Sequence, residues 1–282
     1  YLDKTKKNLI IIEGASWIFY SFVVIFFFKI FLPKTKIIYI SHSIESEIRK
    51  KYSNKFIYLI TLFLEKLVFQ FSDISTSVSE KEKKEINSLY KIKTVLFPNG
   101  IKLNKFKKEK KVKGSYIIYT GSYLYKPNKD AIDYLNEYVM PKLIKKIPNL
   151  NLVLTGGGYK KNYPWLINKG IVSKNDLYNL LFYSKCLCVP LKFGSGTRIK
   201  IIEALCLGAI VISSKKGIEG INLKKNNPPF IFETEKKLIR KIYDVNKNYK
   251  KYKSHSINLK KYYLKKYLMK NIVKKFVNEN KI

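Results

Sequence analysis

Arginine, cysteine and histidine are scarce in this chain of 282 residues. Only three arginines, Arg49, Arg198 and Arg240, stand among its 56 basic residues, so lysine fills almost every basic position. The three cysteines do not suggest a disulfide framework, because such frameworks need an even number. With two histidines besides, the ligands for a zinc site are too few, and we expect no bound metal.

Acidic residues are also few, with 20 against the 56 basic ones, and the formal net charge is +36. Such a charge favours contact with nucleic acid or with an anionic membrane surface. The favoured explanation is a compositional bias, because Lys, Asn, Ile and Tyr are all abundant. The sequence has no zinc-finger, RNP or KH pattern, so we do not expect a nucleic-acid partner. The compositional bias and the membrane surface both remain open.

The N-terminus has no signal-peptide pattern, and the first residue is Tyr1 rather than Met. We therefore expect a fragment that enters its fold in progress and whose first domain is incomplete. Residues 16–32, SWIFYSFVVIFFFKIFL, reach the lower length limit of a membrane span, although Lys29 interrupts them. We predict a buried helix here, with a helix that dips into or spans a membrane as the alternative. The predicted location is cytoplasmic, with the inner face of the membrane as a further possibility.

Short apolar runs alternate with segments of helical spacing along the whole chain. In the first half, strands are predicted at residues 8–14, 36–43, 73–79 and 93–101, with helical segments at 16–32 and 44–72. A further helix is predicted to start at Ser79, because Glu82 three residues later completes a capping-box pattern. Residues 102–114, KLNKFKKEKKVKG, are charged and nearly free of apolar side chains, which indicates a domain boundary.

The same alternation then restarts. Strands are predicted at residues 115–122, 149–158, 185–191 and 209–214, with helices at 128–148, 173–184 and 197–208 and a basic amphipathic helix at 261–280. Alternation of strands and helices is typical of parallel sheets covered by helices. The predicted fold is therefore α/β, with two Rossmann-like domains facing across a cleft. The predicted domains are residues 1–108, 109–254 and the helical tail 255–282.

Three predicted strands of the second half end in glycine. They lead into Gly121, into Gly156–Gly158, and into the sequence FGSGT at 193–197. Ligands of open parallel sheets bind beyond the carboxyl ends of the strands, where glycine lets the backbone approach a phosphate. The third strand end opens a helix that carries Arg198, Lys200 and Glu203.

These residue types suit a nucleoside diphosphate. A planar guanidinium and an ammonium bind phosphate oxygens, and a carboxylate accepts hydrogen bonds from a ribose diol. An explanation without a ligand stays open for each. The glycines could form an ordinary turn, Lys200 could be one solvated lysine among many, and Glu203 could cap a helix or form a surface ion pair. Arg198 is the most distinctive, because lysine serves nearly every other basic position.

The segment PLKFGSGTRIKIIEALCLGAIVISSKKGIEGI at 190–221 resembles the donor-binding segment of retaining GT-B-fold glycosyltransferases, the group called glycosyltransferase family four. YTGSYLYKPNKDAIDYL at 119–135 is similar to the start of their donor domain, and YISHSIESE at 39–47 is similar to the end of their acceptor domain. The resemblance implies transfer of a sugar, with retention, from a UDP- or GDP-linked donor to a glycan or lipid-linked acceptor. It implies no metal or other cofactor.

The resemblance also implies roles for single residues. Arg198 and Lys200 would hold the diphosphate, Glu203 would bind the ribose, and Gly121 would open the donor side of the cleft. Backbone amides near the phosphates and the sugar would come from Gly194, Ser195, Gly196 and Thr197. On the acceptor side, His42 and Glu45 would orient an acceptor hydroxyl, with a turn and a helix-start carboxylate as the alternative. Glu203 is counted with them as a candidate catalytic residue.

Two positions depart from the family pattern. Many members have a glutamate eight positions before the one that corresponds to Glu203, and this chain has Ser195 there. Many members also have an arginine directly after the glycine that corresponds to Gly121, and this chain has Ser122 there. Two other functions therefore stay open beside the glycosyltransferase. One is a sugar-nucleotide epimerase of the same fold. The other is a basic membrane- or nucleic-acid-binding module without catalysis.

Overall fold

A computed structural model of the protein describes residues 8–14, 18–110, 112–194, 196–224, 230–280 and 282. The chain forms two compact units. The first contains residues up to Asn99 together with the segment 195–197, and the second contains Gly100–Gly194 and Arg198–Ile282.

The division at residue 99 precedes the predicted boundary at 108. The reason is that the first residues of the second unit pair with the helical tail. The Ile101 N–H donates to the carbonyl oxygen of Tyr267 at 2.8 Å, and the Met269 N–H donates to the carbonyl oxygen of Ile101 at 3.0 Å. A charged composition therefore does not by itself mark where the contacts change.

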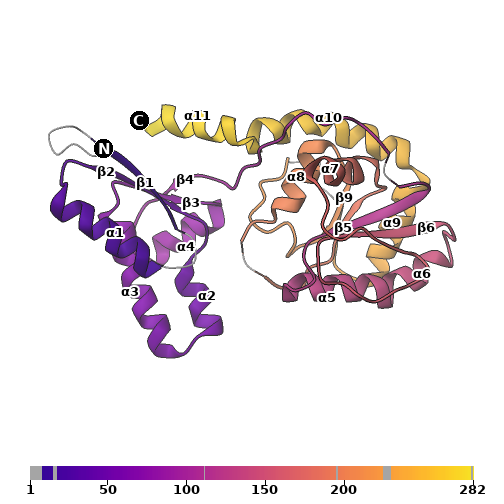
Figure 1. Ribbon diagram of the computed structural model, residues 1–282, viewed down its shortest axis with the longest axis horizontal. Coiled ribbons are helices and arrows are strands. Elements are labelled where there is room, and N and C mark those ends of the chain that lie inside the picture. Colours follow the sequence, from indigo (N-terminus) through magenta and orange to yellow (C-terminus); the bar gives the residue numbers. More distant parts are fainter. Residues whose placement is uncertain (1–7, 15–17, 111, 195, 225–229, 281) are drawn as a thin grey trace. The chain divides into compact units, whose positions relative to one another are not determined.

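The first unit is a sheet of four parallel strands in the order β1-β2-β3-β4, with helices between them (Figure 1). Its elements are β1 (Leu9–Gly14), α1 (Ile18–Phe31), β2 (Lys36–Ser41), α2 (Glu45–Tyr52), α3 (Lys55–Phe71), β3 (Ile74–Ser77), α4 (Glu80–Tyr90) and β4 (Val95–Leu96). The helix predicted to start at Ser79 is confirmed, because the Ser79 hydroxyl accepts from the Glu82 N–H at 3.2 Å.

The segment 44–72, predicted to be helical, forms two helices rather than one. The α2 helix ends at Tyr52, Ser53 is extended, and α3 begins after Asn54. The Asn54 side chain accepts a hydrogen bond from the Ile57 N–H at 2.9 Å and so starts a new helix. The two helices form a hairpin that projects from the first unit (Figure 1).

The apolar run at 16–32 forms α1 over its described part. Ile18, Ser21 and Ile25 are buried, as expected for a helix that packs on a sheet. Phe19, Tyr20 and Phe31 are more than half exposed, so the predicted buried helix is confirmed on one face only. Among the residues that the structure describes, none of the helices combines the length and the apolar character needed to cross a bilayer.

The second unit has six parallel strands in the order β10-β9-β8-β5-β6-β7. Its strands are β5 (Ser115–Thr120), β6 (Leu150–Thr155), β7 (Leu166–Asn168), β8 (Leu187–Val189), β9 (Val211–Ser214) and β10 (Phe230–Phe232). Its helices are α5 (Lys126–Tyr134), the π-helical turn η1 (Leu135–Val139), α6 (Met140–Ile144), α7 (Lys174–Tyr183), α8 (Ile199–Leu207), α9 (Glu235–Lys247), α10 (Tyr249–Tyr267) and α11 (Met269–Asn280).

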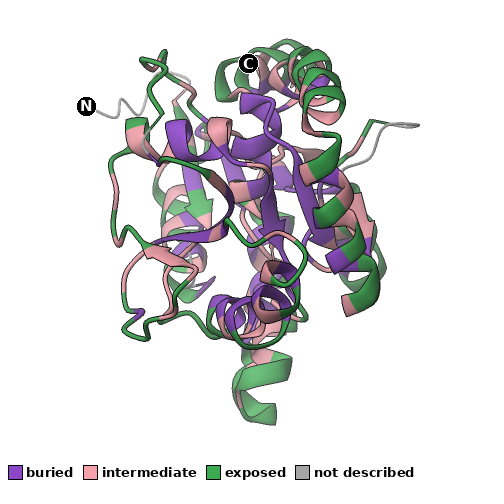
Figure 2. Cartoon of the chain, turned by 90° about the vertical axis from the view of Figure 1, so that its right-hand side faces the viewer, coloured by how far each residue is buried: buried purple, intermediate pink, exposed green. Residues whose placement is uncertain are grey.

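The strands of the second unit form its core, and helices cover them on both sides (Figure 2). The α8 helix contacts both α7 and α10, and α9 contacts both α6 and α10. Ile117, Ile118, Leu152 and Val153 are fully buried, which is why these strands read as continuous apolar runs. The predicted α/β class with parallel sheets is confirmed.

Two predicted helix ends of the second unit are confirmed as well. The Ser173 hydroxyl accepts from the Asp176 N–H at 3.1 Å at the start of α7, and Gly208 ends α8 in the left-handed conformation. The tail differs from the prediction, because it contains two helices separated at Leu268, where the backbone is extended. The α10 helix also runs through the predicted boundary at 254–255.

Candidate functional site

The strand order of the second sheet reverses between β5 and β8. From β5 the chain adds β6 and β7 on one side, and then β8, β9 and β10 on the other. Loops leave in opposite directions at such a point, and they open a crevice at the carboxyl ends of the strands where ligands bind. Here the loop after β5 starts at Gly121, and the segment after β8 leads through Gly194 to the start of α8.

Gly121 lies where a side chain has no room. Its φ is +138°, and an added Cβ would lie 2.7 Å from Asn128 Nδ2 and 2.8 Å from Lys200 Nζ. At the end of the neighbouring strand, a Cβ on Gly156 would lie 2.4 Å from the Gly121 carbonyl oxygen. The two glycines therefore let backbone pack on backbone beside the Lys200 ammonium.

Asn128 holds the Lys200 ammonium in place. Lys200 Nζ donates to Asn128 Oδ1 at 3.0 Å and lies 4.2 Å from the ring centre of Tyr119. The Tyr119 hydroxyl donates to the same oxygen at 2.7 Å, and Asn128 Nδ2 donates to the Ser122 carbonyl oxygen at 2.9 Å. These partners are neutral, so they orient the ammonium without neutralising its charge.

The surroundings disfavour that charge. Burial, and after it the positive charge of Arg198, lowers the pKa of Lys200 from 10.5 to about 7. An anion bound at this place would stabilise the ammonium and raise the pKa again. The site therefore holds a cation that gains from an anionic ligand.

Arg198 is the residue that immediately precedes α8. Its Nη2 atom lies 3.0 Å from where a Cβ on Gly194 would be, so the guanidinium packs on the Gly194 backbone. Burial lowers the pKa of the guanidinium, while Tyr125 and Glu219 act in the opposite direction. Arg198 and Lys200 thus place two positive groups at the N-terminal end of α8. The helix dipole also favours an anion at this end.

Glu203 is buried on α8, one turn after Lys200. Its Oε1 atom accepts a hydrogen bond of 2.5 Å from Lys174 Nζ at the start of α7. Lys174 is largely exposed and also lies over the ring of Tyr178. The carboxylate is therefore held by a largely exposed lysine.

The segment predicted to supply backbone amides is only partly described. Gly194 and Gly196 have φ values of +119° and +75°, a region that favours glycine. An added Cβ on Gly196 would meet nothing within 4 Å. Thr197 is half-buried, and the predicted Ser195 lies outside the described residues. Among the predicted donor residues, the structure brings together Gly121, Gly194, Arg198 and Lys200.

His42 and Glu45 belong to the first unit, at the carboxyl end of β2. His42 is half-buried, and Glu45 is the first residue of α2. The Glu45 carboxylate lies 3.7 Å from Arg49 Nη2 and accepts a weak hydrogen bond of 3.5 Å from the Ser43 hydroxyl. These contacts fit a carboxylate at the start of a helix, which was the alternative to an acceptor-binding role.

Sequence reasoning missed Glu65, which organises this loop. Its carboxylate is buried and accepts from the N–H groups of Glu45 at 2.7 Å and Ser46 at 3.1 Å, and from the Tyr90 hydroxyl at 2.5 Å. Burial raises the pKa of Glu65, while the hydrogen bonds from Ser46 and Tyr90 act in the opposite direction. The available signal was a single carboxylate within the apolar run LITLFLEKLVFQF.

Sequence reasoning also missed Asn128 and Tyr119. No sequence pattern marks them, because their importance comes from contact with Lys200, which lies far along the chain. Within the described ranges, no group of three or more His, Cys, Asp or Glu side chains is arranged to hold a metal ion.

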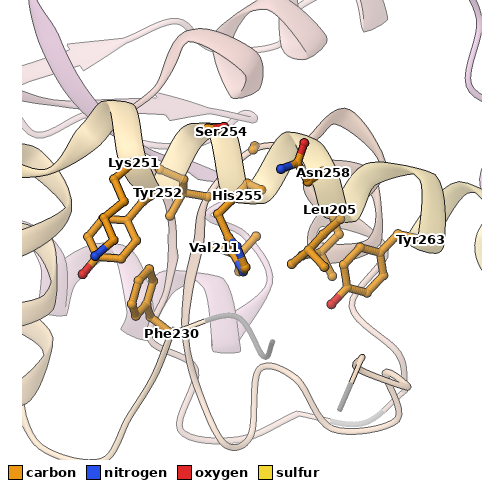
Figure 3. A pocket seen from close by; sticks show the side chains of 13 residues that line it. Leu205, Val211, Phe230, Lys251, Tyr252, Ser254, His255, Asn258 and Tyr263 are labelled. Carbon is orange, nitrogen blue, oxygen red and sulfur yellow. The ribbon is translucent and has the colours of Figure 1, made fainter. Parts of the chain in front are cut away.

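A cavity of about 490 Å³ lies elsewhere in the second unit, between α10 and the start of β9 (Figure 3). Leu205, Val211, Phe230, His255 and Asn258 contribute to its wall. This wall contains the amino end of β9, whereas the candidate site lies at the carboxyl ends of the strands. The cavity is therefore separate from the site around Lys200.

Comparison with known proteins relates part of the chain to a sequence family. Residues 114–248 match the family model described as glycosyl transferases group 1. A search of curated proteins gives no significant match.

Solved structures cover nearly the whole chain. Sucrose-phosphate synthase from Thermosynechococcus elongatus superposes with a TM-score of 0.74 at 14% identity, over 97% of this chain and 73% of that one. TarM gives 0.72 at 13% identity, over 96% and 54%. HepE from Anabaena, in complex with UDP-glucose, gives 0.70 at 13% identity, over 97% and 78%. Residues 114–248 thus carry the sequence pattern of glycosyl transferases group 1, and the chain has the fold of the GT-B glycosyltransferases.

Proposed function

We propose that the protein is a nucleotide-sugar-dependent glycosyltransferase whose donor binds at the switch point of the second unit. One observation carries the proposal. The Lys200 ammonium is fixed by Asn128 against Gly121, with its pKa lowered to about 7, and Arg198 lies at the same helix end. A partly desolvated cation gains strongly from an anionic ligand, and a nucleoside diphosphate supplies one.

The proposed reaction moves a sugar from the diphosphate to an acceptor hydroxyl. The bond between the anomeric carbon and a diphosphate oxygen breaks, a bond from the acceptor oxygen to that carbon forms, and the acceptor hydroxyl passes its proton to the departing diphosphate. Negative charge then develops on the departing diphosphate. Arg198, Lys200 and the N-terminal end of α8 stabilise this charge, so that the proposed step needs no metal or other cofactor.

Glu203 is proposed to bind the ribose of the donor. Its carboxylate accepts hydrogen bonds, and its present partner Lys174 is largely exposed and free to move aside. Gly194, Ser195, Gly196 and Thr197 are proposed to present backbone amides to the phosphates and the sugar. The positive φ values of Gly194 and Gly196 support a backbone that approaches a ligand closely.

His42 and Glu45 are proposed to orient the acceptor, which we take to be a glycan or a lipid-linked acceptor. The transfer is proposed to proceed with retention at the anomeric carbon. The ligands of two similar structures support this class of substrate. Anabaena HepE is solved with UDP-glucose, and a variant of S. aureus TarM is solved with UDP, fondaparinux and α-GlcNAc-glycerol. We propose the cytoplasm as the place of the reaction.

Calorimetric titration with UDP and GDP tests the donor site. The two nucleotides are titrated into the full chain, into Arg198→Ala and into the matched control Arg240→Ala, whose arginine is exposed on α9. We expect saturable binding of one nucleotide that is lost in Arg198→Ala and kept in Arg240→Ala. Absence of binding to the unaltered chain, or equal binding by both variants, would contradict the proposal.

Product analysis separates the transferase from the epimerase of the same fold. With a labelled nucleotide sugar, a transferase releases nucleoside diphosphate only as an acceptor becomes labelled. An epimerase converts the donor sugar without any acceptor. Conversion of that second kind would rule out the proposed reaction while leaving the donor site in place.

A further inference from the structure

The hairpin of α2 and α3 ends in an apolar tip. At the start of α3, Phe56, Ile57, Leu59 and Ile60 are all exposed, and Phe56 is 71% exposed. At 100° per residue, Phe56, Leu59 and Ile60 lie within an arc of about 100° on one face of the helix, and Ile57 lies beside that face. The buried residues of α3 begin only at Thr61, so the first turn of the helix is apolar yet packs against no core.

The apolar surface continues beyond this first turn. Phe63 is 62% exposed on the next turn of α3, and Tyr52 is 69% exposed at the end of α2. We call Tyr52, Phe56, Ile57, Leu59, Ile60 and Phe63 the hairpin tip. A contiguous exposed apolar patch of this kind indicates a surface that binds a partner.

Basic side chains surround the hairpin tip. Lys50, Lys51 and Lys55 are exposed at the turn between the two helices. Glu47 is the exposed carboxylate of α2, and it lies 3.9 Å from Lys50. The end of the hairpin therefore combines aromatic and aliphatic side chains with positive charge, which is the composition of segments that lie in the interface of an anionic membrane.

We propose that the hairpin tip inserts into the headgroup region of an anionic lipid membrane. Phe56, Ile60 and Phe63 would enter the acyl boundary, and the lysines would contact the lipid phosphates. The depth is suitable, because the first two turns of α3 are about 11 Å long and interfacial helices bury about 5–10 Å. This inference does not depend on the proposed reaction, although a membrane-bound enzyme would meet a lipid-linked acceptor directly.

A second copy of the chain fits this surface less well. A two-fold contact brings the same patch of each copy together, so Lys50, Lys51 and Lys55 would face their own counterparts. Like charges in contact oppose association. An anionic membrane instead offers apolar chains to the tip and negative charge to its rim.

Vesicle flotation tests the proposal with the full chain. Vesicles of phosphatidylcholine alone are compared with vesicles that also contain phosphatidylglycerol. We expect binding to the anionic vesicles that weakens with salt. The triple variant Phe56→Ser/Ile60→Ser/Phe63→Ser should lose at least about tenfold in binding, because each side chain no longer buries apolar surface. The triple variant Lys50→Glu/Lys51→Glu/Lys55→Glu should lose roughly fivefold or more per lysine.

Two matched controls give the test its specificity. Lys270→Glu/Lys274→Glu/Lys275→Glu makes the same charge change on exposed positions of α11, and Leu124→Ser/Ile171→Ser removes exposed apolar side chains from the second unit. Both controls should keep most of the binding. If the α11 variant loses binding and the hairpin variants keep it, the membrane contact lies in the tail and the proposal is wrong.

Fluorescence locates the tip in the lipid. In Phe56→Trp, the new indole should shift its emission to the blue on anionic vesicles and be quenched by lipids with brominated acyl chains. A Trp that stays unquenched while the protein is bound would overturn the insertion. Sedimentation equilibrium without lipid gives the remaining outcome, because a dimer that the apolar hairpin variant abolishes would assign this surface to a second copy.

Discussion

The Nζ atom of Lys200 lies 2.8 Å from the place where a Cβ atom on Gly121 would be. The two residues are far apart in the sequence and meet where the loops after β5 and β8 separate. The contact is a second reason for glycine at this position, in addition to its φ of +138°, which side-chain-bearing residues rarely adopt. It also makes the Lys200 ammonium part of the wall of the proposed donor site.

The first prediction concerns Gly121→Ala. The added methyl group would displace Lys200 from Asn128, so we expect the affinity for the nucleoside diphosphate to fall by at least about tenfold, as expected when a charge-assisted contact is lost. The control is Gly170→Ala, because Gly170 also has a positive φ, +59°, but its added Cβ would meet nothing within 4 Å. Calorimetry measures the affinity, and unchanged binding by Gly121→Ala would contradict the proposed role of this contact.

The second prediction concerns pH. Because burial lowers the pKa of Lys200 to about 7, part of the protein holds this residue uncharged slightly above neutral pH, and diphosphate binding should then take up a proton. Calorimetry in buffers with different ionisation enthalpies measures this uptake at pH 8. Lys200→Met should abolish it, whereas the exposed control Lys250→Met should not.

The lowered pKa of Lys200 also makes the stability of the folded protein depend on pH. Between pH 7 and 10.5 the unfolded chain binds a proton at Lys200 that the folded chain lacks, so this residue makes the free energy of unfolding rise with pH. The slope in this interval should be smaller in Lys200→Met. Urea unfolding at several pH values measures it, and identical slopes would show that Lys200 is not buried in the folded protein.

The third prediction concerns the pair of Glu203 and Lys174. If Glu203 binds the ribose, Glu203→Gln should weaken binding of the nucleoside diphosphate but leave the affinity for inorganic diphosphate nearly unchanged. Lys174→Met should bind the nucleotide at least as tightly as the unaltered chain, because the carboxylate no longer has to leave its lysine partner. Equal losses for both ligands in Glu203→Gln would instead indicate a structural role for the ion pair.

The fourth prediction concerns Glu65. Removing its carboxylate in Glu65→Ala leaves the buried N–H groups of Glu45 and Ser46 without an acceptor, at a cost of about 1–3 kcal/mol for each donor in the free energy of unfolding. Glu65→Gln should cost less, because its amide oxygen still accepts. The exposed control Glu47→Ala should change little. Urea unfolding measures these differences, and a loss in Glu65→Ala no larger than that of the control would contradict the prediction.

Glu65 makes the free energy of unfolding change with pH in the opposite direction from Lys200. Burial raises the folded pKa of Glu65, so the folded chain holds the proton more tightly than the unfolded one. The free energy of unfolding should therefore decline as pH rises from the ordinary value of 4.5 through the raised one. Glu65→Gln should remove this decline.

Local patterns predicted the fold class and several element ends. Alternating strands and helices indicated parallel sheets, and the hydroxyls of Ser79 and Ser173 start helices as their capping patterns predicted. These features depend on neighbouring residues only. The split of 44–72 into two helices was missed, because apolar residues on both sides of Asn54 fit one helical period equally well.

The donor site was predicted in part. The segment from Gly194 to Glu203 showed its glycines, basic residues and carboxylate in one run of sequence. Asn128 and Tyr119, which fix the Lys200 ammonium, could not be found in this way. Their role depends on the strand order that brings β5 next to β8. The spacing of apolar residues in the sequence does not predict strand order.

The sequence by itself determined the alternation of strands and helices, several helix starts, and which segment carries the phosphate-binding residue types, because all of these follow from local spacing and side-chain chemistry. Only the tertiary structure decided that Lys200 is partly buried against Gly121, that Glu65 is the acceptor for the start of α2, and that the hairpin tip is exposed. Burial is a property of segments packed together from distant parts of the chain, and it gives Lys200, like Lys253, a pKa below that of an exposed lysine.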